Sequence, residues 1–427
     1  MKTSDIRPRR RIDRRTVLKG AVGVAALGTG ISGFPAYLKA AGKPIRVGMP
    51  TIMSGRVAIL GESSVAAAQL QINRVNKAGG IDGRPLELVV RDSRGKPDEA
   101  ARMTRDLVNN EGCDVILDAE ASSASFAVNE VVRDIKKFCI HSNSETSSLT
   151  ADPKNQVPWV FRSARQGIHD AVGGGLYAAR VAKEKGLKRW ATVSPDYAYG
   201  RANTEEFMEY VKIFAPEVEI IEQTWPKIFQ PDYTENVTAL LNAQPQAVYS
   251  CLWGGDLVAF TDQASLYGLF DQFEAFAVNL GDYPVITAIK SLPAGVHSGS
   301  RYHKDIPDTP ENEAWYAEFM ANSKVLPTNW SWENATAMDF IIAALKATGG
   351  DTDAEKMGKA TAGMTIDSPF GAGGKLTMRD SDHTLVNYMV GYSKTISKDP
   401  YVVDFKQTDW ADIYKHEEEW KKRNGYI

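Results

Sequence analysis

The chain has 427 residues, of which 43% are hydrophobic and 24% charged, with a formal net charge of −3. This length is sufficient for two domains of ordinary size, each with its own hydrophobic core. The charge argues against a nucleic-acid-binding protein, since such proteins need a basic footprint.

The first 42 residues have the three parts of an export signal. Six arginines crowd the front, a weakly apolar stretch covers about residues 20–31, and small residues precede Lys43. The apolar stretch is shorter than the roughly 20 residues that span a bilayer. The pair Arg14-Arg15, followed by "TVLK", is typical of a twin-arginine signal. We therefore predict a twin-arginine signal peptide over residues 1–42 and a periplasmic protein; an uncleaved amphipathic anchor is the alternative.

Beyond this segment the chain is acidic. Removing the nine basic and two acidic residues of positions 1–42 from the 50 and 53 of the whole chain leaves a formal net charge of −10. Three cysteines remain, Cys113, Cys139 and Cys251. An odd number leaves at least one free thiol in an oxidising compartment. A bridge between Cys113 and Cys139 is one possibility, and two buried thiols are the favoured one.

From residue 45 to residue 142 short apolar runs alternate with amphipathic stretches. Strands are expected at 45–49, 86–92, 113–117 and 138–142, and helices at 63–80, 96–110 and 123–137. The runs are apolar throughout, as in a parallel sheet covered on both faces. Residues 150–167 are expected to form a loop.

The same alternation restarts after this loop. Strands are expected at 189–194, 218–223, 247–252 and 273–278, and helices from 169 and at 200–214, 233–242 and 256–268. Beyond Val296 the chain is expected to turn helical, at 311–323, 333–350 and 353–363, with strands at 387–394 and 401–407 and a last helix at 412–423. This pattern predicts an α/β protein with a second lobe of similar design.

Catalytic motifs are missing from the sequence. There is no G-x-S-x-G, and the six histidines show no H-x-x-x-H or H-E-x-x-H spacing. The stretch "GAGGKL" at 371–376 lacks the spacing of a phosphate-binding loop and favours a glycine-rich hairpin turn. We predict no enzymatic activity, no cofactor and no metal site.

Three segments resemble the type I periplasmic binding proteins of the branched-chain amino-acid (Leu/Ile/Val-binding) group. They are "INRVNKAGGIDGRPLELVVRDS" at 72–93, "SPDYAYGRANTEEF" at 194–207 and "FGAGGKLTMRDSDHTLVNYMVG" at 370–391. The resemblance runs from about Ile45 to about Gly391. It implies two Rossmann-like lobes with parallel sheets, joined by a multi-strand hinge. We expect the first lobe to comprise 43–163 and about 299–385, and the second 164–298 and about 386–427.

In parallel α/β sheets, ligands bind beyond the carboxyl ends of the strands and at helix N-termini. Ser122 and Ser123 follow one strand at a helix start, where hydroxyls and amides can hold a carboxylate, the role that the family gives this position. Simple helix capping is the alternative. Asn143, Ser144 and Glu145 follow the next strand. Glu145 is either a partner for an ammonium or amide group, or a solvated charge.

The second lobe contributes three more candidates through the resemblance. Tyr199 is expected to cover the ligand, Trp253 to wall the pocket, and Asp282 to pair with a ligand ammonium. For the doublet Trp330 and Trp332, an aromatic wall is possible, and packing at the lobe surface is expected.

The resulting hypothesis is the substrate-binding component of an ABC importer. Such a protein captures a small polar or carboxylated solute, such as an amino acid, an amide or an aromatic carboxylate, between the lobes. It delivers this solute to a permease in the inner membrane. We expect a monomer that closes about a hinge. The alternatives are a ligand-sensing regulatory subunit and an exported enzyme on the same scaffold.

Overall fold

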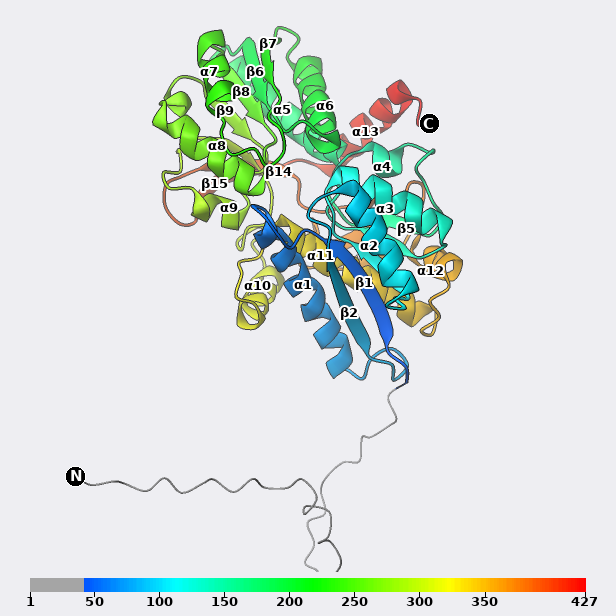
Figure 1. Cartoon of the computed structure of the whole chain (residues 1–427). Helices are drawn as coiled ribbons and strands as arrows, with labels where there is room; N and C mark the ends of the chain where they lie inside the picture. Colours follow the sequence, from blue (N-terminus) through cyan, green and yellow to red (C-terminus); the bar gives the residue numbers. More distant parts are fainter. Residues whose placement is uncertain (1–41) are drawn as a thin grey trace, which may run out of the picture. The chain divides into compact units, whose positions relative to one another are not determined.

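The computed structural model describes residues 42–427 (Figure 1). The export signal predicted for residues 1–42 therefore lies outside the described residues, except for Gly42. Within the described part, no helix is long and apolar enough to cross a membrane.

The first lobe is built on a five-stranded parallel sheet with the order β2-β1-β3-β4-β5. Its strands are β1 (Ile45–Thr51), β2 (Leu86–Asp92), β3 (Val115–Asp118), β4 (Cys139–His141) and β5 (Val160–Arg162). Its early helices are α1 (Ala58–Lys77), α2 (Pro97–Asn109), α3 (Ser122–Asp134) and the short α4 (Ser148–Ala151). Right-handed crossovers with this strand order place α1 on one face and α2 with α3 on the other.

The face of the first sheet that carries α1 is completed by a helix from much later in the chain. Helix α11 (Asn329–Ala347) packs along α1, as Figure 1 shows. Fifteen of its 19 residues are buried, so it is a core helix without a solvent-facing side. Helix α2, by contrast, buries Ala100, Thr104 and Leu107, which recur on one face at helical spacing.

The second lobe is built on a seven-stranded sheet with the order β15-β14-β10-β9-β8-β6-β7. Its strands are β6 (Arg189–Val193), β7 (Glu219–Thr224), β8 (Ala247–Ser250), β9 (Glu274–Ala277), β10 (His297–Gly299), β14 (Gly391–Thr395) and β15 (Val402–Gln407). Its helices are α5 (Gly167–Lys185), α6 (Ala198–Phe214), α7 (Thr234–Ala243), α8 (Gly254–Leu266), the 3-10 turn η1 (Leu269–Asp271) and α9 (Tyr283–Ala288). Strands β6 to β10 are parallel, and β14 and β15 extend the sheet antiparallel.

The chain passes between the two sheets three times: after β5, after β10, and between β13 and β14. The remaining elements are α10 (Pro310–Asn322), α12 (Ala354–Thr361), the antiparallel sheet β11 (Thr365–Asp367), β12 (Lys375–Met378) and β13 (Leu385–Val386), and the terminal helix α13 (Trp410–Asn424). Helix α13 packs on α5. Each lobe thus combines segments that are far apart in the sequence; the exact lobe boundaries remain a prediction.

Several expectations from the sequence need correction. Strand β5 lies inside the predicted loop 150–167, and β10 lies where the chain was expected to turn helical. Both strands have three residues, too short for a periodic pattern. The parallel sheets expected for the two lobes are present, and in the second sheet two further strands, β14 and β15, are added antiparallel at one edge.

Other expectations are confirmed. The glycine-rich segment forms the turn of the β11–β12 hairpin, with Gly373 and Gly374 at positive φ. All three cysteines are free and buried.

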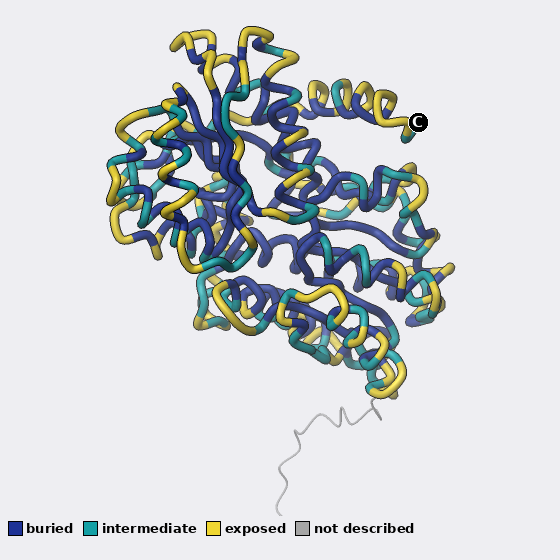
Figure 2. The backbone as a smooth tube through the Cα atoms, turned by 45° about the horizontal axis from the view of Figure 1, so that its top comes forward, coloured by how far each residue is buried: buried dark blue, intermediate teal, exposed yellow. Residues whose placement is uncertain are grey.

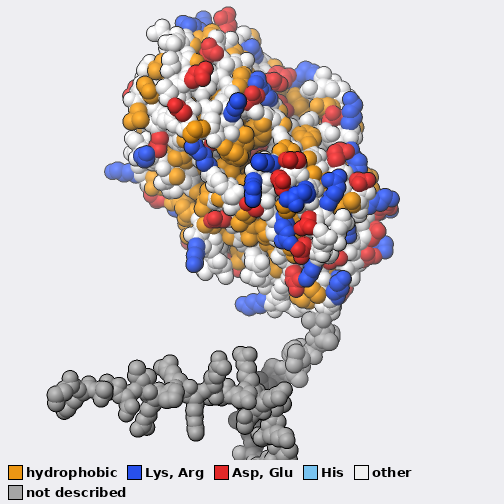
Figure 3. All heavy atoms as spheres, viewed as in Figure 1, with side chains coloured by type: hydrophobic (Ala, Val, Ile, Leu, Met, Phe, Trp, Pro, Cys, Tyr) orange, Lys and Arg blue, Asp and Glu red, His pale blue; other side chains and the backbone are white. Residues whose placement is uncertain are grey.

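The strands and the sides of the helices that face them are buried, and exposed residues lie along the outer turns (Figure 2). On the face shown in Figure 3, basic and acidic side chains are interspersed and lie around hydrophobic areas. This mixture fits the absence of a basic footprint in the sequence.

Candidate functional site

A cavity of about 430 Å³, including its opening to solvent, lies where the carboxyl ends of both sheets meet. It is lined by Leu60, Ala121, Ser122, Asn143, Glu145, Tyr197, Tyr199, Trp253, Gly254, Asn279, Asp282, Asn329 and Trp330. Most of these residues directly follow a strand: β3 and β4 in the first lobe, and β6, β8 and β9 in the second. Crevices at the carboxyl ends of parallel strands, between two lobes, are where small molecules bind in α/β proteins.

Three helices begin at this cavity without a side-chain cap. The N-cap residues of α3, α6 and α8 are Ala121, Tyr197 and Trp253, and none accepts a bond from its own first turn through its side chain. The positive ends of the helix dipoles and their first N–H groups therefore converge on the cavity. Such an arrangement favours a negatively charged ligand group.

Aromatic rings form the walls between these helix ends. Trp253 and Trp330 lie 5.6 Å apart between ring centroids, with an interplanar angle of 33°, and Tyr197 lies 5.9 Å from Tyr199. Trp330 is 6% exposed. The expectation that it packs at the lobe surface is therefore wrong, because it lines the cavity across the interlobe cleft from Trp253.

Tyr199 owes its position to the glycine that follows it. A Cβ atom at Gly200 would lie 1.8 Å from the carbonyl oxygen of Pro195, so no side chain fits where the first turn of α6 meets the end of β6. The Tyr199 hydroxyl accepts a hydrogen bond of 2.9 Å from Asn279 Nδ2, which also donates to the carbonyl oxygens of Cys251 and Leu252. This contact fixes the ring against the cavity.

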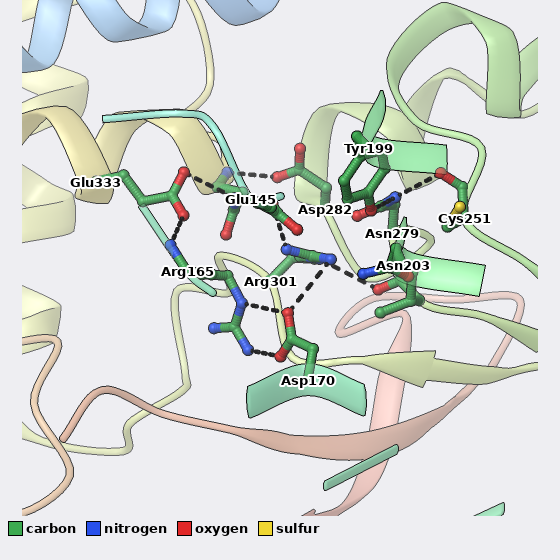
Figure 4. Close-up of polar contacts among 12 residues, drawn as sticks. Glu145, Arg165, Asp170, Tyr199, Asn203, Cys251, Asn279, Asp282, Arg301 and Glu333 are labelled. Atoms are coloured by element: carbon green, nitrogen blue, oxygen red, sulfur yellow. Dashed lines mark hydrogen bonds and ion pairs between the residues drawn. The ribbon is translucent and has the colours of Figure 1, made fainter. Parts of the chain in front are cut away.

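A buried network of charges, here called the floor, reaches the cavity wall at Glu145 and continues behind it (Figure 4). Arg301 Nη1 donates to Glu145 Oε1 at 2.7 Å, and Arg301 Nη2 lies 3.6 Å from Asp170 Oδ2. Arg165 Nε donates to Asp170 Oδ2 at 3.0 Å, and the Arg165 backbone N–H donates to Glu333 Oε1 at 2.8 Å. Glu145 is therefore not a solvated loop charge, because it forms a buried ion pair with Arg301.

Burial shapes the protonation of this floor. It raises the pKa of Glu333 well above its ordinary value, and it raises the pKa of Asp282 to about 7. Asp282 Oδ1 accepts the Asn329 backbone N–H at 2.8 Å, and Glu333 Oε2 accepts a bond of 2.9 Å from Asn329 Nδ2. Asp282, expected as the ammonium partner, is therefore already tied to the N-terminus of α11.

Six of the eight predicted site residues line the cavity: Ser122, Asn143, Glu145, Tyr199, Trp253 and Asp282. Ser123 is half-buried on α3 and Ser144 is buried beyond the wall; neither lines the cavity. Whether the six bind a ligand remains a prediction.

The sequence reading missed Tyr197, Asn279 and Asn329. The rule that ligand-binding residues follow the ends of strands could have identified Asn279, which follows β9. The same rule could not identify Arg301 as the partner of Glu145, because 156 positions separate the two residues.

Several buried polar atoms at the cavity have no hydrogen-bond partner among the described residues. On the cavity-lining residues these include the donors Asn143 Nδ2 and Trp253 Nε1 and the acceptor Glu145 Oε2. Buried polar groups in proteins are normally satisfied, so these atoms can pair with polar groups of a ligand. Nothing in residues 42–427 groups three or more side chains that could hold a metal ion.

Comparison with known proteins agrees with this geometry. A curated relative, the leucine-, isoleucine-, valine-, threonine- and alanine-binding protein of Pseudomonas aeruginosa, is 23% identical over 80% of this chain and 88% of its own length. Among solved structures, a solute-binding protein of an ABC transporter from Rhodopseudomonas palustris BisB5, in complex with 3,4-dihydroxybenzoic acid, superposes with a TM-score of 0.77. It is 21% identical and covers 86% of this chain and 97% of its own.

A second R. palustris solute-binding protein, in complex with benzoate, superposes with a TM-score of 0.75 at 22% identity, covering 85% of this chain and 96% of its own. These likenesses show the same two-lobed fold. The model of the periplasmic binding protein family matches residues 44–393. The chain therefore belongs to the periplasmic binding protein family, and its role is to bind a substrate.

Proposed function

We propose that this protein is the substrate-binding component of an ABC importer and that it captures a small carboxylated solute in the interlobe cavity. The observation that supports this most strongly is the convergence of three uncapped helix N-termini on a small cavity with aromatic walls. It needs no covalent chemistry, only closure of the two lobes around the ligand.

Helix α3 is the proposed anchor for the ligand carboxylate. Ser122 lines the cavity in the first turn of α3, and its Oγ accepts the Thr146 backbone N–H at 3.3 Å. The hydroxyl proton of Ser122 is therefore free to point to a ligand oxygen. Together with the N–H groups of the first turn, it can hold a carboxylate without a fixed cation.

The apolar body of the ligand would lie between the rings of Tyr199, Trp253 and Trp330. The names of the similar proteins support this general description. One relative is named for binding aliphatic amino acids, and two similar structures contain benzoic acids. These ligands share a carboxylate and, in most cases, an apolar body.

Delivery and location complete the proposal. As a periplasmic binding protein with an export signal predicted at residues 1–42, the chain would work as a monomer outside the inner membrane. Its twin-arginine pair, Arg14-Arg15, would direct export. A membrane permease would then receive the ligand.

A thermal-shift screen against amino acids, amides, urea and aromatic acids tests the proposal. The protein is first unfolded and refolded so that a co-purified ligand is removed. A ligand at 100 times its dissociation constant should add about 2.7 kcal/mol to the free energy of unfolding. Small-angle scattering should then show compaction with that ligand. The proposal fails if no carboxylate raises the melting temperature.

A further inference from the structure

The charge at the floor of the cavity distinguishes two classes of carboxylated ligand. An α-amino acid brings an ammonium group together with its carboxylate, and burying this cation requires an uncompensated negative partner. A carboxylate without an amine requires no such partner. The question is therefore whether the cavity offers a free negative charge.

Glu145 does not offer one. Its Oε1 receives Arg301 Nη1 at 2.7 Å, and the Arg301 side chain is 1% exposed, so the pair is shielded from solvent. Asn329 Nδ2 also reaches Oε1, at 3.4 Å. The charge of the carboxylate is thus compensated from within the protein. Its unpartnered Oε2 remains able to accept a bond from a neutral O–H or N–H group of a ligand.

The rest of the floor is also balanced. Asp170 is paired with Arg165 and lies 3.6 Å from Arg301. Glu333 accepts the Arg165 backbone N–H and the Asn329 side chain, and burial raises its pKa well above the ordinary value, which favours the uncharged form. Asp282, the remaining acid at the cavity, accepts the Asn329 backbone N–H, and burial raises its pKa to about 7, so that below this pH it is mostly protonated and carries no free charge.

We propose that Arg301 sets the ligand class by neutralising Glu145, so that the cavity selects carboxylates that lack an ammonium group, such as aromatic or branched aliphatic acids. This inference rests on the proposed function, because it deepens the description of the same cavity. Arg301 does not line the cavity, so it acts as a positioning residue through Glu145. Its place in the chain supports this role: it directly follows β10, at the second crossing between the lobes.

Two matched pairs of probes separate the effect of the amine from that of the side chain. Phenylacetate is compared with L-phenylglycine, and 4-methylpentanoate with L-leucine, by calorimetric titration of the refolded protein at about pH 6, where Asp282 is mostly protonated. We expect each acid without an amine to bind at least about tenfold more tightly than its partner, a difference of about 1.4 kcal/mol. Tighter binding of both amino acids overturns the inference but leaves the proposed function intact. Binding of none of the four probes, nor of benzoate, counts against the proposed function itself.

Variants then test the role of Arg301. Arg301→Gln should lower the preference of the protein for the amine-free acid over the amino acid by about tenfold, or reverse it, because the charge of Glu145 is left uncompensated. Arg301→Lys should retain the preference, and the double variant Glu145→Gln/Arg301→Gln should restore it. Because Arg301→Gln risks a loss of folding, Glu145→Gln alone provides a second test. This variant leaves the buried Arg301 cation without its partner, so it should widen the preference for phenylacetate over L-phenylglycine through tighter binding of phenylacetate. A selective loss of L-phenylglycine binding with no gain for phenylacetate would instead identify Glu145 as the ammonium partner and overturn the inference.

Discussion

Asp282 provides a quantitative test of how burial acts at this site. Burial raises the pKa of its carboxyl from 3.8 to about 7, against the opposing effects of the Asn329 and Tyr283 backbone N–H groups and of Arg301. The folded protein thus binds a proton on Asp282 at pH values where the unfolded chain has released it. The stabilisation is complete below pH 3.8 and is lost progressively as the pH rises to about 7.

Replacing Asp282 by asparagine removes this pH-dependent cost. One pKa unit corresponds to about 1.36 kcal/mol, so at pH 8 the cost of ionising Asp282 in the folded state is at most about 4 kcal/mol. We expect Asp282→Asn to stabilise the protein at pH 8, by somewhat less than this. The amide oxygen can still accept the Asn329 N–H bond, though more weakly than a carboxylate. From pH 5 to pH 8 the advantage of the variant should grow by about 2–3 kcal/mol.

Urea unfolding of the ligand-free protein at several pH values measures this difference. Asp367→Asn is a suitable control, since the Asp367 side chain is 88% exposed. The control should change the free energy of unfolding little and equally at all pH values. An Asp282→Asn variant that is destabilised to the same extent at pH 5 and pH 8 would refute the reasoning. Asp282 would then have to be ionised throughout this range.

Three further predictions concern the cavity and the core. Ser122→Ala should weaken the binding of the ligand carboxylate, measured by calorimetry, by about tenfold, because one hydrogen bond to a charged group is lost. The control Ser123→Ala, on the same helix, should leave this affinity unchanged. Trp253→Ala should weaken ligand binding by about 10- to 100-fold, whereas the control Trp225→Ala, which removes a ring outside the cavity that stacks under Arg201, should not. Equal losses in the two variants would contradict the assignment of Trp253 to the cavity wall. The three buried thiols should react with a disulfide reagent only as fast as the protein unfolds, and rapid labelling of any one under native conditions would disagree with their burial.

The sequence predicted the parts of the site that depend on local order. Alternation of strands and helices located the carboxyl ends of the strands, and this rule led to Ser122, Asn143 and Glu145 in the first lobe. Tyr199 and Trp253 followed from the resemblance of the second lobe to a known family. These residues lie within a few positions of a strand end, so their placement needs no knowledge of distant contacts.

The rest of the site depends on contacts between distant segments. Trp330 reaches the cavity because the chain returns to the first lobe after β10 and brings the start of α11 opposite Trp253. The pairing of Glu145 with Arg301 joins segments 156 positions apart. A single sequence contains no local signal for such contacts, and reading Glu145 alone left its partner undetermined.

The position of α11 in the chain has a consequence for biosynthesis. The five strands of the first sheet are complete when residue 162 has been made, but the helix that covers α1 ends at residue 347. At 5–20 residues per second, the ribosome needs about 10 to 40 s to supply the intervening chain. During this time the apolar surface of α1 has no cover from its own molecule. The nascent first lobe therefore exposes the apolar surface on which α11 later packs, and this lobe cannot be completed before residue 347 has been made.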